Sequence, residues 1–150
     1  GGTELESLRA YAQELGVANY VTFTGRVSDD DLVAMLNTAD LCVNPDVPNV
    51  MNDKSTMTKI MEFMALGKPI VQFDLTEGRV SAREASLYAR NHDEHDFAEK
   101  ILRLIDDPSL RREMGEYGRN RVLQELTWEH SVPTLLAAYE ALWPDNTGTR

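Results

Sequence analysis

Short apolar runs alternate with stretches of helical periodicity along this chain, and that alternation limits the possible folds more than any other feature. The apolar runs are rich in β-branched or aromatic residues, and most of them end at a residue typical of turns, which predicts strands. They cover residues 20–25, 39–45, 69–74 and 86–89. Strands that alternate with helices predict an α/β fold, in which a Rossmann-like parallel sheet is flanked by helices on both faces. Such sheets bind ligands at the carboxyl ends of their strands.

The helical stretches have apolar residues at intervals of three and four, and several have recognisable ends. The first helix is expected to end at Gly16, Ser28 is expected to cap the second, and Gly67 is expected to stop the third. With 150 residues, no internal repeat and no evident linker, the sequence predicts one domain over residues 1–150, with a loose tail at 144–150. The expected helices cover residues 5–15, 28–38, 55–66, 96–105, 108–123 and 127–143.

The charge balance limits the possible partners. Fifteen basic and 25 acidic residues give a net charge of −10, which repels nucleic acid and anionic lipid surfaces. An anionic ligand would therefore need local donors such as backbone amides. The longest apolar stretch, 132–143, contains Glu140 and is too short to span a membrane. The single cysteine, Cys42, lies in an apolar run and fits a reducing compartment, so we expect a cytoplasmic protein without a transmembrane segment.

A polar loop followed by the start of the third helix is the strongest candidate site. The backbone amides of Ser55, Thr56, Met57 and Thr58 are expected at a helix N-terminus, where unpaired donors and the helix dipole favour phosphate. Lys54 adds a positive charge, and the Ser55 and Thr56 hydroxyls add two flexible partners. The alternative interpretation is that Ser55 only caps the helix.

Glu62 is a single carboxylate within the apolar pattern of that helix. Helical geometry places it at the edge of the apolar stripe, whose members are Met57, Ile60, Met61, Met64 and Ala65. A carboxylate there could accept two hydrogen bonds from vicinal hydroxyls such as those of a ribose. It could equally be a solvated residue at the flank of the helix.

Neither metal nor cofactor is expected from the sequence. His92 and His95 lie in a charged helix entry without further ligands at zinc spacing, and His130 is expected at a surface helix start. The three consecutive acids Asp29, Asp30 and Asp31 suit the positive end of a helix dipole better than they suit a metal.

Three segments, taken in order, resemble the donor-binding domain of family 4 retaining glycosyltransferases, which have the GT-B fold. They are VTFTGRVSDDDLVAMLNTADLCVNP, STMTKIMEFMALGKPIV and FAEKILRLIDDPSLRREMGEYGRNRV. The resemblance covers nearly the whole chain, and the combination is far more specific than any single segment. It implies the C-terminal domain of an enzyme that transfers a sugar from a UDP or GDP sugar to a cell-surface polysaccharide or glycolipid, with retention of anomeric configuration.

The resemblance also assigns roles to individual residues. Glu62 falls on the second Glu of the family signature, which holds the ribose hydroxyls, and the helix start at Ser55, Thr56 and Met57 falls on the diphosphate site. Gly25, Arg26 and Val27 fall on the turn that borders the base. Lys54 stands eight residues before Glu62, where the family pattern has a first Glu that contacts the donor sugar. Asp53 or Lys54 could take that place, so the catalytic residue stays open.

The family implies parts that lie before residue 1. These are an N-terminal acceptor-binding domain, two basic residues that neutralise the diphosphate, and the first strands of the sheet. We therefore expect weak nucleotide binding, no turnover by this chain alone, and pairing through an exposed edge at the 20–25 strand. The full-length enzyme is expected in the cytoplasm, peripheral at the inner membrane. The alternative is a non-catalytic Rossmann-like module that binds nucleotides or regulates.

Overall fold

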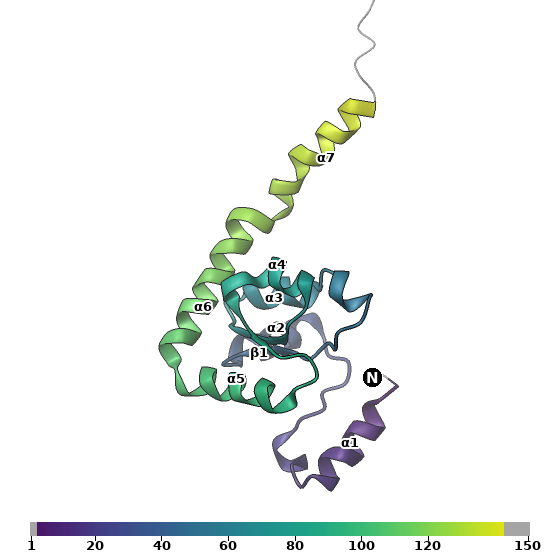
Figure 1. Ribbon diagram of the computed structural model, residues 1–150, viewed down its shortest axis with the longest axis vertical. Helices are drawn as coiled ribbons and strands as arrows, with labels where there is room; N and C mark the ends of the chain where they lie inside the picture. Colours follow the sequence, from purple (N-terminus) through teal and green to yellow (C-terminus); the bar gives the residue numbers. More distant parts are fainter. Residues whose placement is uncertain (1–2, 143–150) are drawn as a thin grey trace, which may run out of the picture. The chain divides into compact units, whose positions relative to one another are not determined.

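The computed structural model describes residues 3–142, which fall into two compact units divided between Met35 and Leu36 (Figure 1). The first unit contains the helix α1 (Leu5–Glu14), the 3-10 turn η1 (Ala18–Tyr20) and the start of α2 (Asp29–Thr38). The tail predicted for 144–150 lies outside the described residues.

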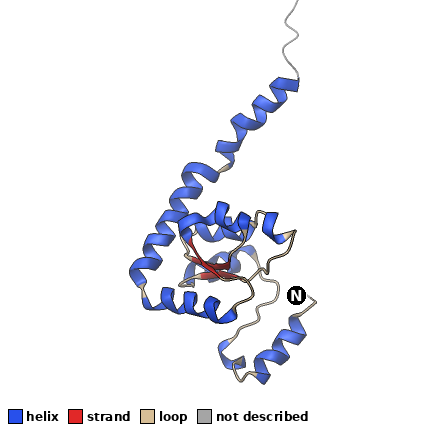
Figure 2. Cartoon of the chain, viewed as in Figure 1, coloured by secondary structure: helices blue, strands red, loops and turns tan. Residues whose placement is uncertain are grey.

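The second unit is built on a parallel three-stranded sheet, with β1 (Cys42–Asn44), β2 (Ile70–Phe73) and β3 (Ser86–Ala89) in the order β1-β2-β3. Cys42 aligns with Ile70, and Ile70 aligns with Ser86. Figure 2 shows the strands lying between helices. This arrangement confirms the predicted α/β fold and three of the predicted strands.

The helices of the second unit connect the strands and then continue after the sheet. Between β1 and β2 the chain forms η2 (Asn52–Lys54) and α3 (Thr58–Ala65), and between β2 and β3 it forms α4 (Thr76–Ala82) and η3 (Arg83–Ala85). After β3 come α5 (Glu94–Asp106), α6 (Pro108–Arg121), the π-helical segment η4 (Val122–Leu126) and α7 (Trp128–Leu142).

The central strand β2 is buried on both faces, as expected of a parallel sheet covered by helices. On one face Ile70 packs in a cluster with residues of α3, α4 and η3, namely Ile60, Met64, Ala82 and Ala85. On the other face Val71 and Phe73 pack with residues of β3, α5 and α6, namely Ala89, Phe97, Leu104 and Met114. These two apolar clusters hold α3 and α4 on one side of the sheet and α5 on the other, while α6 packs against both, with Met114 in the second cluster and Tyr117 against the first.

Two buried polar side chains interrupt the face that α3 and α4 cover. Asn44 ends β1 and aligns with Gln72 of β2, and each is only 1% exposed. Gln72 donates weakly to the Gly78 carbonyl, at 3.5 Å, while neither side-chain polar atom of Asn44 has a hydrogen-bond partner among the described residues. The carboxyl end of β1 is therefore more polar than the rest of the core.

The turn after α3 is as predicted, and it also contacts another helix. Gly67 has a φ of +67°, which glycine adopts without strain, and Lys68 donates its amide to the Phe63 carbonyl across the turn. Gly115 of α6 lies so close that a Cβ there would overlap the Gly67 carbonyl oxygen. The α6 backbone thus packs directly on the end of α3.

The prediction of a strand at 20–25 was wrong. Residues 18–20 form η1 and residues 21–25 form no regular structure, with Tyr20 89% exposed. The β-branched and aromatic composition suits a strand, but a strand also needs a neighbour for its backbone hydrogen bonds, and none of the described strands pairs with this segment. The exposed strand edge expected there is accordingly absent from the described residues.

The start of the third helix and one additional helix also differ from the prediction. The sequence suggested a helix over 55–66, whereas α3 starts at Thr58, with Ser55 in extended conformation and Met57 at the N-cap. The short helix α4 was not predicted at all. Its seven residues include Gly78 and are too few to show a clear helical period.

Candidate active site at the start of α3

The loop between β1 and α3 is shaped by its own hydrogen bonds. The Asn49 side-chain oxygen accepts the amides of Met51 and Asn52 at 3.0 and 2.8 Å, and Asn52 donates its side-chain amide to the Val47 carbonyl at 2.9 Å. This loop follows the carboxyl end of β1, which is where ligands bind in parallel sheets.

The loop is also held against the first turn of α3. The Asp46 carboxylate lies 2.7 Å from the Lys59 ammonium group, across the length of the loop. The Lys59 charge is thereby paired with protein. Lys54, which directly precedes Ser55, makes no ion pair among the described residues.

The start of α3 lacks a side-chain cap. Its N-cap residue, Met57, has no hydrogen-bonding side chain, and the hydroxyl of Ser55 donates to the Met51 carbonyl at 2.6 Å instead. The alternative role of Ser55 as the helix cap is therefore wrong. Its hydroxyl helps to close the loop before the helix.

Backbone amides remain open at this helix start. The Ser55 amide makes a long hydrogen bond of 3.4 Å to the Asn52 carbonyl. Within residues 3–142 the structure gives no partner to the amides of Thr56, Met57 and Thr58. Unpaired donors at the positive end of a helix dipole form a site suited to an anion such as a phosphate.

Glu62 lies one helical turn after Thr58 on the exposed surface of α3. Residues four apart share a helix face, so Glu62 lies on the same side of α3 as Thr58. Its carboxylate has no hydrogen-bond or ion-pair partner among the described residues. It is free to accept hydrogen bonds from a ligand.

Asp53 and Lys54 differ in their surroundings. Asp53 accepts the backbone amide of Thr76, the first residue of α4, at 2.8 Å, whereas the Lys54 side chain is exposed to solvent. One Asp53 oxygen is thus engaged in holding the loop to α4. Of the two residues, Lys54 has the freer side chain.

A second link between this loop and α4 was not predicted from the sequence. The Thr56 hydroxyl donates to Glu77 Oε1 at 2.7 Å, and the Ser81 hydroxyl donates to the same oxygen at 3.0 Å. The only sequence signal was Glu77 itself, an acid in the first turn of a helix, and that signal is visible only once α4 is recognised.

Gly25, Arg26 and Val27 lie in the first unit, which is described by itself. Gly25 has a φ of +65° at a turn, and the Arg26 side chain is exposed. Their grouping with α3 stays a prediction.

The histidines and acids considered as metal ligands do not gather into a site. Asp29, Asp30 and Asp31 form the first turn of α2, where Ser28 accepts the Asp31 amide at 3.2 Å as a cap. Across residues 3–142, no group of three or more His, Cys, Asp or Glu side chains is placed to hold a metal ion.

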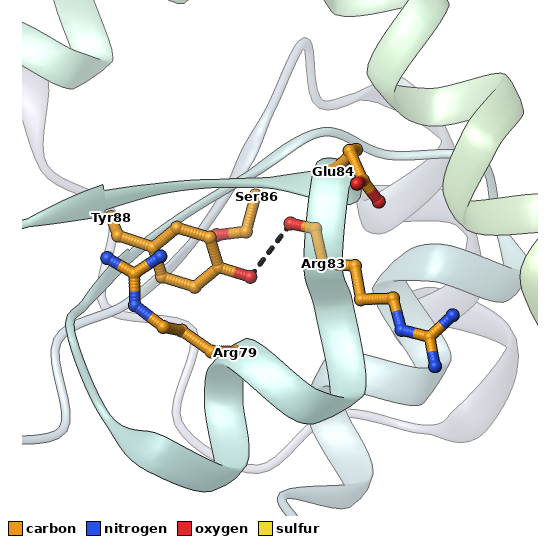
Figure 3. Close-up of a pocket in the computed structure, with 5 residues that line it drawn as sticks. All are labelled: Arg79, Arg83, Glu84, Ser86 and Tyr88. Atoms are coloured by element: carbon orange, nitrogen blue, oxygen red, sulfur yellow. Dashed lines mark hydrogen bonds between the residues drawn. The ribbon is translucent and has the colours of Figure 1, made fainter.

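A surface hollow of about 380 Å³ lies between α4 and β3, lined by Arg79, Arg83, Glu84, Ser86 and Tyr88 (Figure 3). Its charges are already paired with protein. Arg79 bonds to Asp74 and stacks 4.4 Å from the Tyr88 ring centre, while Arg83 lies 3.5 Å from Glu125.

The hydroxyl of Tyr88 points to the Arg83 carbonyl, at 2.8 Å, and burial raises the pKa of Tyr88. Glu84 accepts a hydrogen bond from Tyr117, which lowers the pKa of Glu84. None of the predicted site residues lines this hollow, which is less suited to an anion than the start of α3.

A family model described as glycosyl transferases group 1 matches residues 1–107, well over half of the sequence. The chain belongs to this family. The match includes β1, the start of α3, and α4, so the candidate site lies within the part of this group 1 glycosyl transferase chain that defines its family.

Relatives with known names are also glycosyltransferases. A D-inositol 3-phosphate glycosyltransferase of Corynebacterium jeikeium is 31% identical over 96% of this chain and 33% of its own length. An MMP alpha-(1->4)-mannosyltransferase of Mycolicibacterium hassiacum is 28% identical over 85% of this chain and 30% of its own. A GDP-mannose-dependent alpha-(1-6)-phosphatidylinositol monomannoside mannosyltransferase of Mycobacterium tuberculosis is 29% identical over 86% of this chain and 34% of its own.

This group 1 glycosyl transferase chain also has a structural match. The structure of sucrose-phosphate synthase from Thermosynechococcus elongatus superimposes with a TM-score of 0.82 and 25% identity, over 95% of this chain and 35% of the other. The chain thus spans about a third of the length of the relatives it matches. The match confirms the predicted GT-B type of α/β fold.

The part of the chain that the structure describes contains no helix long and apolar enough to cross a membrane.

Proposed function

We propose that this chain is the donor-binding part of a retaining glycosyltransferase that uses a nucleoside diphosphate sugar, with UDP or GDP as the nucleotide. The observation that carries the proposal is the start of α3, where the amides of Thr56, Met57 and Thr58 are unpaired within the described residues. A chain with a net charge of −10 has no general attraction for a diphosphate, so local donors of this kind are what it can use.

Glu62 extends the proposed site from the diphosphate to the ribose. It lies four residues after Thr58, which is about 6 Å along the helix axis. Its free carboxylate can accept hydrogen bonds from both ribose hydroxyls while the helix start holds the phosphates. Lys54 is proposed to contact the donor sugar or the phosphates, and Gly25, Arg26 and Val27 to border the base.

The rest of the reaction is proposed from the family. The acceptor would be a cell-surface polysaccharide or glycolipid, bound by an N-terminal domain, and the full-length enzyme would act in the cytoplasm at the inner face of the membrane. The alternative, a module that binds nucleotides without catalysis, differs from this proposal in having no turnover.

The experiment is a titration of the full-length protein with a panel of UDP and GDP sugars, followed by replacement of Glu62. Glu62→Ala should raise the Kd for the preferred donor about tenfold to a hundredfold, because hydrogen bonds to a charged group contribute about 1.5–3 kcal/mol. Glu62→Ala should also lose sugar transfer.

The matched control is Glu99→Ala, which removes another exposed acid, from α5, and should leave affinity unchanged. A wild-type protein that binds no nucleotide sugar would contradict the proposal. Binding without turnover by the full-length protein would favour the non-catalytic module.

A further inference from the structure

The segment of residues 53–57, here called the pre-α3 segment, is fixed to α4 at two points. At its beginning, Asp53 accepts the Thr76 amide at 2.8 Å, and near its end the Thr56 hydroxyl donates to Glu77 at 2.7 Å. The two pairs join residues that are 23 and 21 positions apart in the chain. In addition, η2 packs against α4. The shape of the pre-α3 segment therefore depends on the first turn of another helix.

The Thr56 link determines what that side chain can do for a ligand. A threonine hydroxyl can donate one hydrogen bond, and in this structure Glu77 accepts it. The hydroxyl therefore cannot also donate to a phosphate oxygen in this arrangement. Thr56 instead serves the site through its backbone, because the fixed side chain sets the direction of the neighbouring amides.

The Ser81 hydroxyl supports this arrangement from within α4. It donates to the same Glu77 oxygen at 3.0 Å, from one helical turn further along. The Glu77 carboxylate is thus fixed within its own helix while it accepts the Thr56 hydroxyl. The carboxylate joins a rigid helix to the segment whose amides lie open.

We propose that Glu77 is a positioning residue for the donor diphosphate. By accepting the Thr56 hydroxyl, it keeps the amides of Thr56, Met57 and Thr58 directed outward toward the ligand. This inference rests on the proposed function of the α3 start. It goes beyond that function because Glu77 touches neither phosphate nor sugar and acts through Thr56.

The charge of Glu77 allows a positioning role to be distinguished from a purely electrostatic effect on donor affinity. A carboxylate near a diphosphate repels it, so removing the charge alone would tighten binding. Removing the hydrogen bond loosens the pre-α3 segment and weakens binding. Weaker binding after loss of the carboxylate therefore indicates positioning, and tighter binding indicates simple electrostatics.

The test uses the full-length enzyme with UDP and GDP sugars. Glu77→Ala should raise KM for the donor about threefold to tenfold with kcat nearly unchanged, as expected for one lost hydrogen bond that acts on ground-state binding. Glu77→Gln removes the charge but keeps an oxygen acceptor for Thr56, so it should bind the donor as tightly as wild type or more tightly. Thr56→Val should match Glu77→Ala, and Thr56→Ser should restore binding.

Amide hydrogen exchange without nucleotide gives an independent measurement. Exchange at the hydrogen-bonded amides that border the pre-α3 segment, those of Ile60 and Thr76, should be faster in Glu77→Ala and close to wild type in Glu77→Gln. The control is Glu113→Ala, which removes an exposed acid from α6 and should change neither exchange nor KM.

The outcomes separate this inference from the proposed function. If wild type binds the donor and Glu77→Ala binds it equally well or more tightly, the positioning role is overturned while the proposed function stands. A Glu77→Gln variant as weak as Glu77→Ala also overturns the positioning role. If wild type binds no nucleotide sugar, both are overturned.

Discussion

The starts of α3 and α6 are built differently. At α6, the Asp107 carboxylate accepts the Leu110 amide at 2.9 Å, and Pro108 occupies the first turn, where it has no amide to satisfy. At α3, the N-cap residue Met57 has no capping side chain, and the first amides remain open within the described residues. The donors at the start of α6 are therefore used within the fold, whereas those at the start of α3 remain available to a ligand.

The largest effect should come from giving α3 the proline that α6 has. Thr58→Pro removes one open amide at a position where proline is tolerated, and Met57 already has the extended backbone that a residue before proline prefers. We expect donor affinity to fall about tenfold or more with little change in the free energy of unfolding. Nucleotide titration and urea denaturation of the full-length protein measure the two quantities.

Thr58→Ala is the control, because it removes the same side chain and keeps the amide. It should bind the donor more tightly than Thr58→Pro. Equal affinities of the two variants would mean that the Thr58 amide does not contact the ligand.

A smaller effect is expected at the start of α6. Asp107→Ala should lower the free energy of unfolding by about 1 kcal/mol, because the Leu110 amide loses its partner. Asp107→Asn should recover most of the loss. Urea denaturation checks both, with the adjacent Asp106→Ala as a control that removes a charge without removing a cap. If Asp106→Ala lowered the free energy of unfolding as much as Asp107→Ala, the result would argue against a capping role of Asp107.

The smallest effect should be the pH dependence contributed by Asp96, in the first turn of α5. The Arg90 amide donates to its carboxylate at 2.7 Å, and with the nearby Lys100 this lowers the pKa of Asp96. A lowered pKa in the folded state means that the stabilisation is present above the unfolded-state value of about 3.9 and is lost as pH falls below it.

This prediction is measured by urea denaturation of wild type and Asp96→Asn at pH 7 and pH 3. The difference in stability between the two proteins should narrow at the lower pH. An unchanged difference would show that the charge on Asp96 does not contribute.

The sheet and most helices could be predicted because their signals are local. The runs at β1, β2 and β3 are short and apolar, and Gly67 and Ser28 mark helix ends by their own chemistry. The segment at 20–25 has the same kind of local signal, yet it forms no strand, because pairing depends on a neighbour that local composition does not specify.

The candidate site was predicted only in part for a similar reason. The open amides and Glu62 follow from helix geometry, so the position of the site was accessible from the sequence. The start of α3 at Thr58 and the role of Ser55 within the loop could not be predicted. The reason is that a serine hydroxyl can either cap a helix or hydrogen-bond within the preceding loop. The Thr56 and Glu77 pair joins residues 21 positions apart, and no periodicity predicts such a contact.

The close approach of Gly115 to the Gly67 carbonyl has a consequence for how this chain tolerates change. Any side chain at position 115 would meet backbone, which cannot move aside as a flexible side chain can. At Gly78, by contrast, an added Cβ would meet only the end of the Gln72 side chain. In a library of random variants selected for folding, position 115 should therefore keep glycine, while position 78 should accept alanine.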